Sequence, residues 1–154
     1  MPLPTEWLST IQSANFPDRT IRHRDFLAYL DPNPGYDFAD GDFVIGPGLA
    51  DGRLFSIQST NFPNYYLRHQ DLRLKLQQYS PGDDQFAQDA TFELTPALAY
   101  AQVDKAGVSF RAYNLPDHFL RHSNFEIWLN RYDGSELFRL DASFWVNEHS
   151  GHIG

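Results

Sequence analysis

The stretch IQSANFPDRTIRH at residues 11–23 recurs twice further along the chain. The second copy is IQSTNFPNYYLRH at residues 57–69, and the third is FRAYNLPDHFLRH at residues 110–122. All three align without a gap, keep an Asn two residues before a Pro, and end in Arg-His. A repeat of this kind indicates a fold assembled from one supersecondary unit used three times.

Each copy continues with an alternating run, a turn and a closing Asp. In the second copy Leu72, Leu74 and Leu76 alternate with polar residues, a period of two that predicts a half-buried strand. The third copy alternates in the same way from Phe125 to Leu129. Turn-forming residues follow, and we expect loops there. An Asp then stands three residues before a Phe in every copy: Asp40, Asp89 and Asp141.

These units predict an all-β fold, because no helical periodicity longer than a turn or two is visible. Three copies are too few for a propeller, which usually has about four to eight blades. A linear solenoid would need polar capping repeats. We therefore predict a β-trefoil with pseudo-threefold symmetry. It is a single domain over residues 1–154, with repeats at about 7–50, 51–100 and 101–148 and a flexible tail at 149–154.

The charge balance limits the partners. Twenty acidic residues against 12 basic ones give a formal net charge of −8, which repels nucleic acid and anionic membrane surfaces. No run approaches the roughly 20 apolar residues of a membrane span. The sequence predicts a neutral partner, with neither nucleic acid nor membrane involved.

Residues that carry catalysis or bind metal are not arranged in any known motif. The chain has no Cys, which excludes disulfides and thiolate metal sites. We expect His149 and His152 to lie in a disordered end with too few ligands for a metal. Glycoside hydrolysis needs two carboxylates at one bond, whereas the repeated Asp residues belong to different thirds of a trefoil. Nucleophile elbows, P-loops and dinucleotide fingerprints are also absent, so we predict no catalysis, metal or cofactor.

The repeated motifs resemble a known family. Asn-Phe-Pro, Tyr-Leu-Arg-His, a strand, a turn and Asp-Ala-Thr-Phe follow one another as in the arabinofuranose-binding domain, the family 42 carbohydrate-binding modules. The resemblance runs from about Trp7 to Val146. It implies a β-trefoil of the kind attached to fungal and bacterial α-L-arabinofuranosidases and related hemicellulases. It also implies that each copy can carry a shallow pocket for an L-arabinofuranosyl side chain of arabinoxylan or arabinan.

The resemblance further implies a His, an Asp and an aromatic ring at each site. The corresponding residues are His69, Asp89 and Tyr66 in the second copy, and His122, Asp141 and Phe119 in the third. The first copy keeps His23 and Asp40 but has Thr20 at the aromatic position. It also has Gly41-Asp42 where the others have Ala-Thr or Ala-Ser, together with a shorter turn. These departures favour the second and third sites over the first.

Such residues suit a small neutral polyol. An ionised Asp accepts hydrogen bonds from two hydroxyl groups, a neutral His both donates and accepts, and an aromatic ring covers the C–H face of a sugar.

A structural role remains open for each of these residues. The Asp residues can cap turns through their own backbone. One of Tyr65 and Tyr66 faces outward by alternation, and we interpret Trp128 as a packing residue. We interpret the repeated Arg residues as holding loop carbonyls, and the repeated Asn residues first as turn formers. These are Arg22, Arg68 and Arg121, and Asn15, Asn61 and Asn114.

The leading hypothesis is a non-catalytic module that tethers a glycoside hydrolase catalytic domain to arabinose-decorated polysaccharide. The alternative is a stand-alone β-trefoil lectin for another glycan, or a trefoil that contacts protein, because trefoils host unrelated functions. Residues 1–7 lack the basic and apolar segments of a signal peptide, whereas the resemblance implies secretion.

Overall fold

A computed structural model describes residues 7–35, 38–100 and 106–150. Within these ranges the chain forms twelve strands, two short α-helices and one 3₁₀ helix, so the all-β prediction is confirmed. The first copy contains β1 (Trp7–Ser13), β2 (Arg19–Arg24), β3 (Leu27–Pro32), η1 (Ala39–Gly41) and β4 (Phe43–Pro47). The second contains β5 (Phe55–Ser59), β6 (Tyr65–Gln70), β7 (Arg73–Gln78), α1 (Asp84–Asp89) and β8 (Phe92–Pro96). The third contains β9 (Val108–Ala112), β10 (His118–Ser123), β11 (Glu126–Arg131), α2 (Glu136–Asp141) and β12 (Phe144–Ser150).

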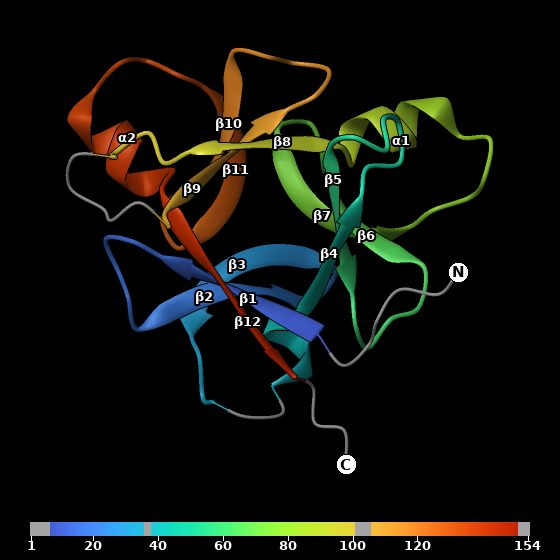
Figure 1. Ribbon diagram of the computed structural model, residues 1–154, viewed down its shortest axis with the longest axis horizontal. Coiled ribbons are helices and arrows are strands. Elements are labelled where there is room, and N and C mark those ends of the chain that lie inside the picture. The colour runs from blue at the N-terminus through green and yellow to red at the C-terminus, as the bar shows by residue number, and fades with distance from the viewer. Residues whose placement is uncertain (1–6, 36–37, 101–105, 151–154) are drawn as a thin grey trace.

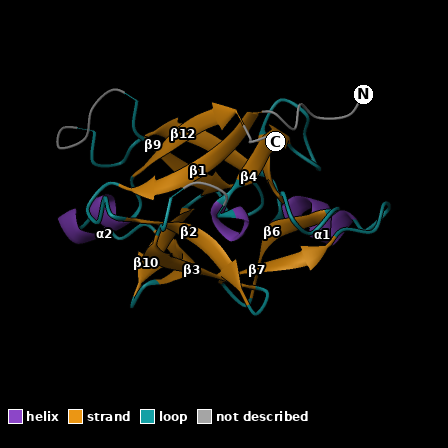
Figure 2. Ribbon diagram, turned by 90° about the horizontal axis from the view of Figure 1, so that it is seen from below, coloured by secondary structure: helices purple, strands orange, loops and turns teal. Residues whose placement is uncertain are grey.

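Six strands pair in a closed ring. The pairings run from β1 to β4, β5, β8, β9, β12 and back to β1, so each of these strands has two neighbours in the barrel. The hairpins β2–β3, β6–β7 and β10–β11 lie on one side of this barrel (Figure 2). In the view of Figure 1, the three hairpins form three lobes around the centre of the molecule. Closing the barrel leaves these six strands without an unpaired edge.

The three hairpin tips are joined to one another through the backbone. Phe26 O accepts a hydrogen bond from Leu76 N at 3.0 Å, and Leu72 O accepts one from Leu129 N at 2.8 Å. Phe125 O completes the set with Leu30 N at 2.8 Å. Each hairpin therefore bonds to the next.

Each tip is a two-residue turn in which both residues have positive φ. That conformation matches the twist of a tight hairpin, and Asp and Asn adopt it more readily than most residues. Leu72 and Phe125 occupy the second turn position and are 40% and 38% exposed. Their expected places inside half-buried strands are therefore wrong. Leu74, Leu76, Ile127 and Leu129, the other members of those runs, are buried in the core as predicted.

The centre of the hairpin layer holds Arg73, which the alternation placed on a polar face. Its side chain is buried, and its Nη1 donates to Ala28 O at 2.9 Å and to Leu74 O at 3.0 Å. The guanidinium lies 4.9 Å from the centre of the Tyr29 ring and 5.4 Å from that of Trp128. Burial lowers the pKa of Arg73. Trp128 is thus a packing residue, as interpreted from the sequence.

Two segments differ from the expected loops. Helices α1 and α2 begin at the turn-rich stretches of the second and third copies, where Asp83 and Ser135 accept hydrogen bonds from Phe86 N and Phe138 N. These caps stabilise the first turn, and six residues are too few to show a helical periodicity.

The predicted flexible tail is wrong at its start. His149 lies in β12 opposite Leu8 of β1, because the pairing of these strands continues to residue 150. His152 lies outside the described residues. In the part of the chain that is described, no group of three or more His, Cys, Asp or Glu side chains can hold a metal. No described helix is long and apolar enough to cross a bilayer.

Candidate functional site

The Arg of each Arg-His motif is held in the same way in all three copies. Its Nε donates to the carbonyl of the following His at 2.9–3.1 Å, and its Nη2 donates to the closing Asp. Its guanidinium also lies 4.8–4.9 Å from the centre of a Phe ring, which belongs to Phe38, Phe86 or Phe138. The Arg residues therefore hold carbonyls as interpreted, although these belong to strands and not to loops.

The Asn of each Asn-x-Pro motif bonds to the preceding copy. Asn114 Nδ2 donates to Asp89 Oδ1 at 2.8 Å, and Asn114 Oδ1 lies 2.8 Å from His69 Nε2. Because an amide oxygen only accepts, Nε2 of His69 donates in this bond. Asn61 bonds in the same way to Asp40 and His23, and Asn15 to Asp141 and His122. We call these three sets the Arg–His–Asp–Asn clusters.

The sequence interpretation had missed this role of the Asn residues. An available signal was their identity in all three copies, since the residue that follows changes from Phe16 and Phe62 to Leu115. A turn alone would accept Asp, Ser or Gly at the same place.

The clusters differ in exposure. The side chains of Asp89 and Asp141 are 6% and 8% exposed, whereas that of Asp40 is 37% exposed. Asp89 accepts from Arg68, Gln85 and Asn114, which occupy three of its roughly four acceptor positions. The three His side chains are all buried. The structure therefore brings together the predicted His and Asp of each copy. Their hydrogen-bonding groups are used mainly by the Arg of the same copy and the Asn of the next.

The predicted aromatic residues pack into small ring clusters. Tyr66 contacts Tyr79, whose ring centre is 5.4 Å from that of Phe86 on α1. Phe119 contacts Tyr132, whose ring centre is likewise 5.4 Å from that of Phe138 on α2. Burial raises the pKa of Tyr66. Both predicted rings thus serve the packing of the helices.

A pocket of about 470 Å³ lies in the second copy beside its cluster. Its lining residues are Phe26, Tyr65, Arg68, Leu76, Gln77, Gln78, Asp83 and Phe86. The rings of Phe26 and Tyr65 are 5.9 Å apart, and Arg68 donates both to Gln77 Oε1 at 2.6 Å and to Asp89. Arg68 therefore connects the pocket to the buried cluster, and Tyr65 lines it in place of Tyr66.

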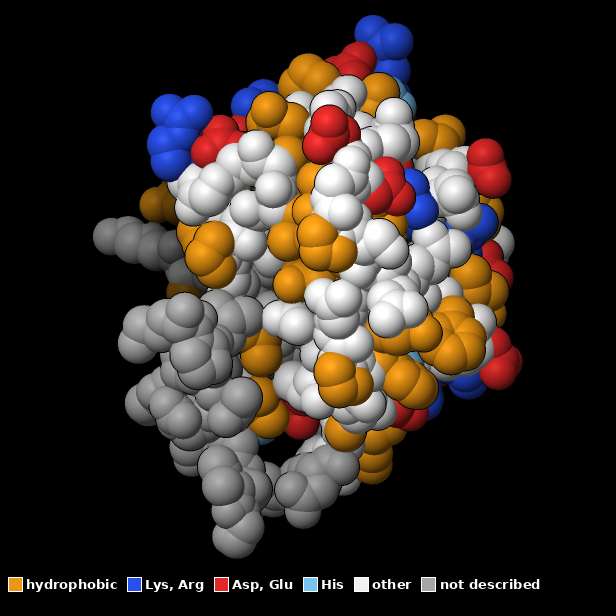
Figure 3. All heavy atoms as spheres, turned by 90° about the vertical axis from the view of Figure 1, so that its right-hand side faces the viewer, with side chains coloured by type: hydrophobic (Ala, Val, Ile, Leu, Met, Phe, Trp, Pro, Cys, Tyr) orange, Lys and Arg blue, Asp and Glu red, His pale blue; other side chains and the backbone are white. Residues whose placement is uncertain are grey.

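The corresponding positions in the other copies are less aromatic. The strand pairings place His118 in the third copy where the second has Tyr65, and the preceding hairpin tip offers Leu72 in place of Phe26. Beside the first copy lies the hairpin tip of the third copy with Phe125, and the guanidinium of Arg19 lies 3.9 Å from the centre of the Phe125 ring. On the face at the right-hand side of Figure 1, hydrophobic side chains are scattered over the described surface, and charged side chains lie in small groups between them (Figure 3).

A closed barrel with three hairpins on one side is the architecture of the β-trefoil class. Residues 9–146 match the family model described as the alpha-L-arabinofuranosidase B (ABFB) domain. The chain belongs to this family, the arabinofuranose-binding, family 42 type of carbohydrate-binding domain.

Three known proteins illustrate the likeness. Alpha-L-arabinofuranosidase B of Emericella nidulans is 35% identical over 65 residues, which are 42% of this chain and 13% of that enzyme. A GH54 α-L-arabinofuranosidase mutant soaked with 4-nitrophenyl α-L-arabinofuranoside superposes with a TM-score of 0.79 at 23% identity, over 96% of this chain and 32% of the other. The BEL β-trefoil superposes with a TM-score of 0.66 at 14% identity, over 96% and 97% of the two chains. The chain thus has the β-trefoil fold and spans a small part of the enzymes it matches.

Removing the Asn of a buried cluster should destabilise the fold. Asn114→Ala leaves Asp89 and His69 each without one partner, which should lower the free energy of unfolding by about 1–3 kcal/mol. Asn61→Ala should cost less than Asn114→Ala, because its partner Asp40 is 37% exposed and can bond to water instead, although its other partner, His23, is buried. Urea denaturation measures both, with Gln88→Ala on the exposed face of α1 as the control. Equal losses at Asn61 and Asn114 would contradict this account.

Acid should weaken the cluster of the third copy. Burial lowers the pKa of His122 below its ordinary value of 6.5, against the opposing charge of Asp141. The unfolded chain therefore takes up this proton first as the pH falls. The contribution of His122 to the free energy of unfolding is constant well above about pH 6.5. It declines from about pH 6.5 down to the pKa of His122 in the folded protein, by at most about 1.4 kcal/mol per pH unit.

Urea denaturation at pH of about 7.5 and about 5.5 measures this decline. His122→Gln keeps a donor toward Asn15 and removes the titration, so its decline should be smaller than that of the unaltered protein. An identical decline in both proteins would show that His122 is not responsible.

Proposed function

We propose that this domain binds terminal L-arabinofuranosyl side chains of arabinoxylan or arabinan and catalyses no reaction. The observation that carries the proposal is the pocket of the second copy, which Phe26 and Tyr65 line together with the polar groups of Arg68 and Gln77. Membership of the arabinofuranose-binding family supports the choice of sugar.

The chemistry of this pocket suits a neutral sugar. The two rings supply apolar surface for the C–H groups of a furanose, and Gln77 and Gln78 supply amides that donate and accept. Arg68 is already neutralised by Asp89, so the pocket carries little uncompensated positive charge for an anion. Shape and hydrogen bonding therefore select the ligand.

The predicted His and Asp residues have a secondary place in this proposal. Asp89 and Asp141 accept a sugar hydroxyl only through the acceptor positions that Arg and Asn leave. His69 and His122 hold the bridging Asn residues in place. In the first copy His23 and Asp40 form the most exposed cluster. The pocket of the second copy, to which the hairpin tip of the first copy adds Phe26, is the main site.

We also infer that the three copies are related by a pseudo-threefold axis. Support comes from the hydrogen bonds that recur at matching positions, from the hairpin tips to the Arg–His–Asp–Asn clusters. The recurrence also supports a non-catalytic role, since each repeated Asp is held by the Arg of its own copy. The relatives support an enzyme as partner, since they are arabinofuranosidases of which this chain covers only 13% or 32%.

Calorimetric titration with arabinoxylan, with undecorated xylan in parallel, tests the proposal. Tyr65→Ala should weaken binding to arabinoxylan about tenfold or more, because a ring face of the main site is lost. Tyr100→Ala is the matched control, since that side chain is 52% exposed and does not line the pocket.

The outcomes separate the hypotheses. Binding to arabinoxylan alone, weakened only by Tyr65→Ala, supports the proposed site. Equal binding to both polymers would contradict recognition of the arabinose side chain. No binding to either polymer, or to arabinan, would favour a lectin for another glycan or a protein partner.

A further inference from the structure

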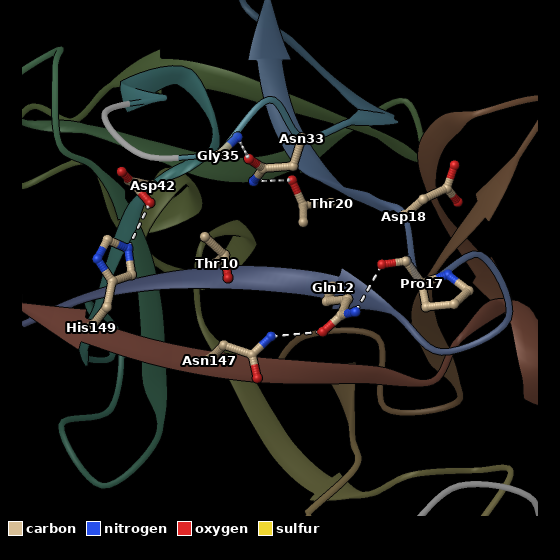
Figure 4. Close-up of a pocket in the computed structure, with 10 residues that line it drawn as sticks. All are labelled: Thr10, Gln12, Pro17, Asp18, Thr20, Asn33, Gly35, Asp42, Asn147 and His149. Carbon is tan, nitrogen blue, oxygen red and sulfur yellow. Dashed lines mark hydrogen bonds and ion pairs between the residues drawn. The ribbon is translucent and has the colours of Figure 1, made fainter.

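The first copy contains a second pocket, of about 500 Å³, at the junction of β1, β12 and the segments around β2 and η1 (Figure 4). Its lining residues are Thr10, Gln12, Pro17, Asp18, Thr20, Asn33, Gly35, Asp42, Asn147 and His149. None of these described residues lines the pocket of the second copy or belongs to the three clusters. It is a separate cavity.

Three lining residues are those at which the first copy departs from the others. Thr20 pairs with Gln12 as Tyr66 pairs with Gln58, so Thr20 replaces an aromatic residue. Asn33 N bonds to Asp18 O in the position where Tyr79 and Tyr132 bond to the corresponding carbonyls. Asp42 directly precedes Phe43, and the corresponding residues before a Phe in the other copies are Thr91 and Ser143.

The first two departures remove bulk. In the second copy the rings of Tyr66 and Tyr79 lie 6.0 Å apart, and Phe119 and Tyr132 make the same contact in the third. The first copy has instead a short polar pair, in which Asn33 Nδ2 donates to Thr20 Oγ1 at 3.0 Å. Space that rings fill in two copies is therefore lined by hydrogen-bonding groups in the first.

The third departure adds a carboxylate. The hydroxyls of Thr91 and Ser143 donate to carbonyls at the ends of α1 and α2, at 2.7 Å in both cases. Asp42 follows the short helix η1, and its Oδ1 lies 3.0 Å from His149 Nε2 on β12. An acceptor group thus lines the pocket where the other copies have a hydroxyl turned into the fold.

The remaining polar groups are oriented by one another. Gln12 Nε2 donates to Pro17 O at 2.8 Å, Asn147 Nδ2 donates to Gln12 Oε1 at 2.8 Å, and Gly35 N donates to Asn33 Oδ1 at 2.7 Å. Fixed side chains lose little freedom when a ligand binds, which favours affinity.

We propose that this pocket binds a neutral sugar, as a second site independent of the one in the second copy. Three amide side chains and two threonine hydroxyls both donate and accept, as ring hydroxyls do. No Lys or Arg is among the described residues that line it, and Asp18 and Asp42 disfavour an anion. The volume lies within the range of small-molecule sites.

Titration of the isotope-labelled protein with L-arabinose and, separately, with xylobiose tests the inference by NMR. The side-chain amide signals of Gln12, Asn33 and Asn147 report on this pocket, and those of Gln77 and Gln78 on the pocket of the second copy. We expect at least one sugar to shift the first group saturably. Thr20→Tyr should weaken that response about tenfold or more, because it restores the ring of the other copies.

Two further variants make the test decisive. Asp42→Thr installs the residue of the second copy and should also weaken the response, whereas Thr95→Tyr on β8 adds the same ring elsewhere and should not. The inference is wrong if neither sugar moves the first group, or if Thr20→Tyr and Asp42→Thr respond as the unaltered protein does. Shifts confined to Gln77 and Gln78 would overturn this site and leave the proposed function standing. Shifts confined to Gln12, Asn33 and Asn147 would support this site and contradict the proposed site in the second copy.

Discussion

The contact on which the rest of the structure depends is the bond from each Asn-x-Pro asparagine to the Asp and His of the preceding copy. Each cluster takes three side chains from one copy and one from the next, so no copy completes its cluster alone. The last contact, from Asn15 to Asp141, joins the start of the chain to its third copy, beside the pairing of β1 with β12. Breaking such a buried set leaves polar groups without partners in a low dielectric, which costs more than the bonds themselves contribute.

This constraint decides where a ligand can bind. Three of the roughly four acceptor positions of Asp89 are occupied, and Arg121 and Asn15 occupy two of those of Asp141, so recognition falls on the surfaces beside the clusters. Arg68 joins the two in the second copy, because it belongs to the cluster and also lines the pocket. The first copy reaches a different result with the same framework: smaller and more polar residues leave a cavity where aromatic rings pack in the others. One fold thus offers surfaces of different chemistry without any change in its strand pairing.

The repeat made much of this predictable. Three matching copies and period-two runs predicted the all-β class, and residues such as Leu74 and Ile127 take their places in the core because alternation follows from strand geometry. The family resemblance implied that His69 and Asp89 share a site, although spacing alone did not show that they meet. The bridging Asn114 comes from the next copy, and a contact between copies leaves no trace in the spacing within one. Leu72 and Phe125 were misplaced because turn conformation interrupts the alternation. The two pockets depend on which side chains of separate hairpins meet, as Phe26 meets Tyr65, and no pattern in a linear sequence states this.

The most direct test of the central claim is a crystal structure of the protein soaked with an arabinofuranosyl-substituted xylobiose. If the clusters hold the fold together and the sugar binds beside them, the arabinose will contact Tyr65 and Phe26, and the bonds of Asp89 to Arg68 and Asn114 will persist. If Asp89 instead turns away from Asn114 to take the sugar hydroxyls, the cluster is a binding site that the sugar completes, and the account given for it is wrong.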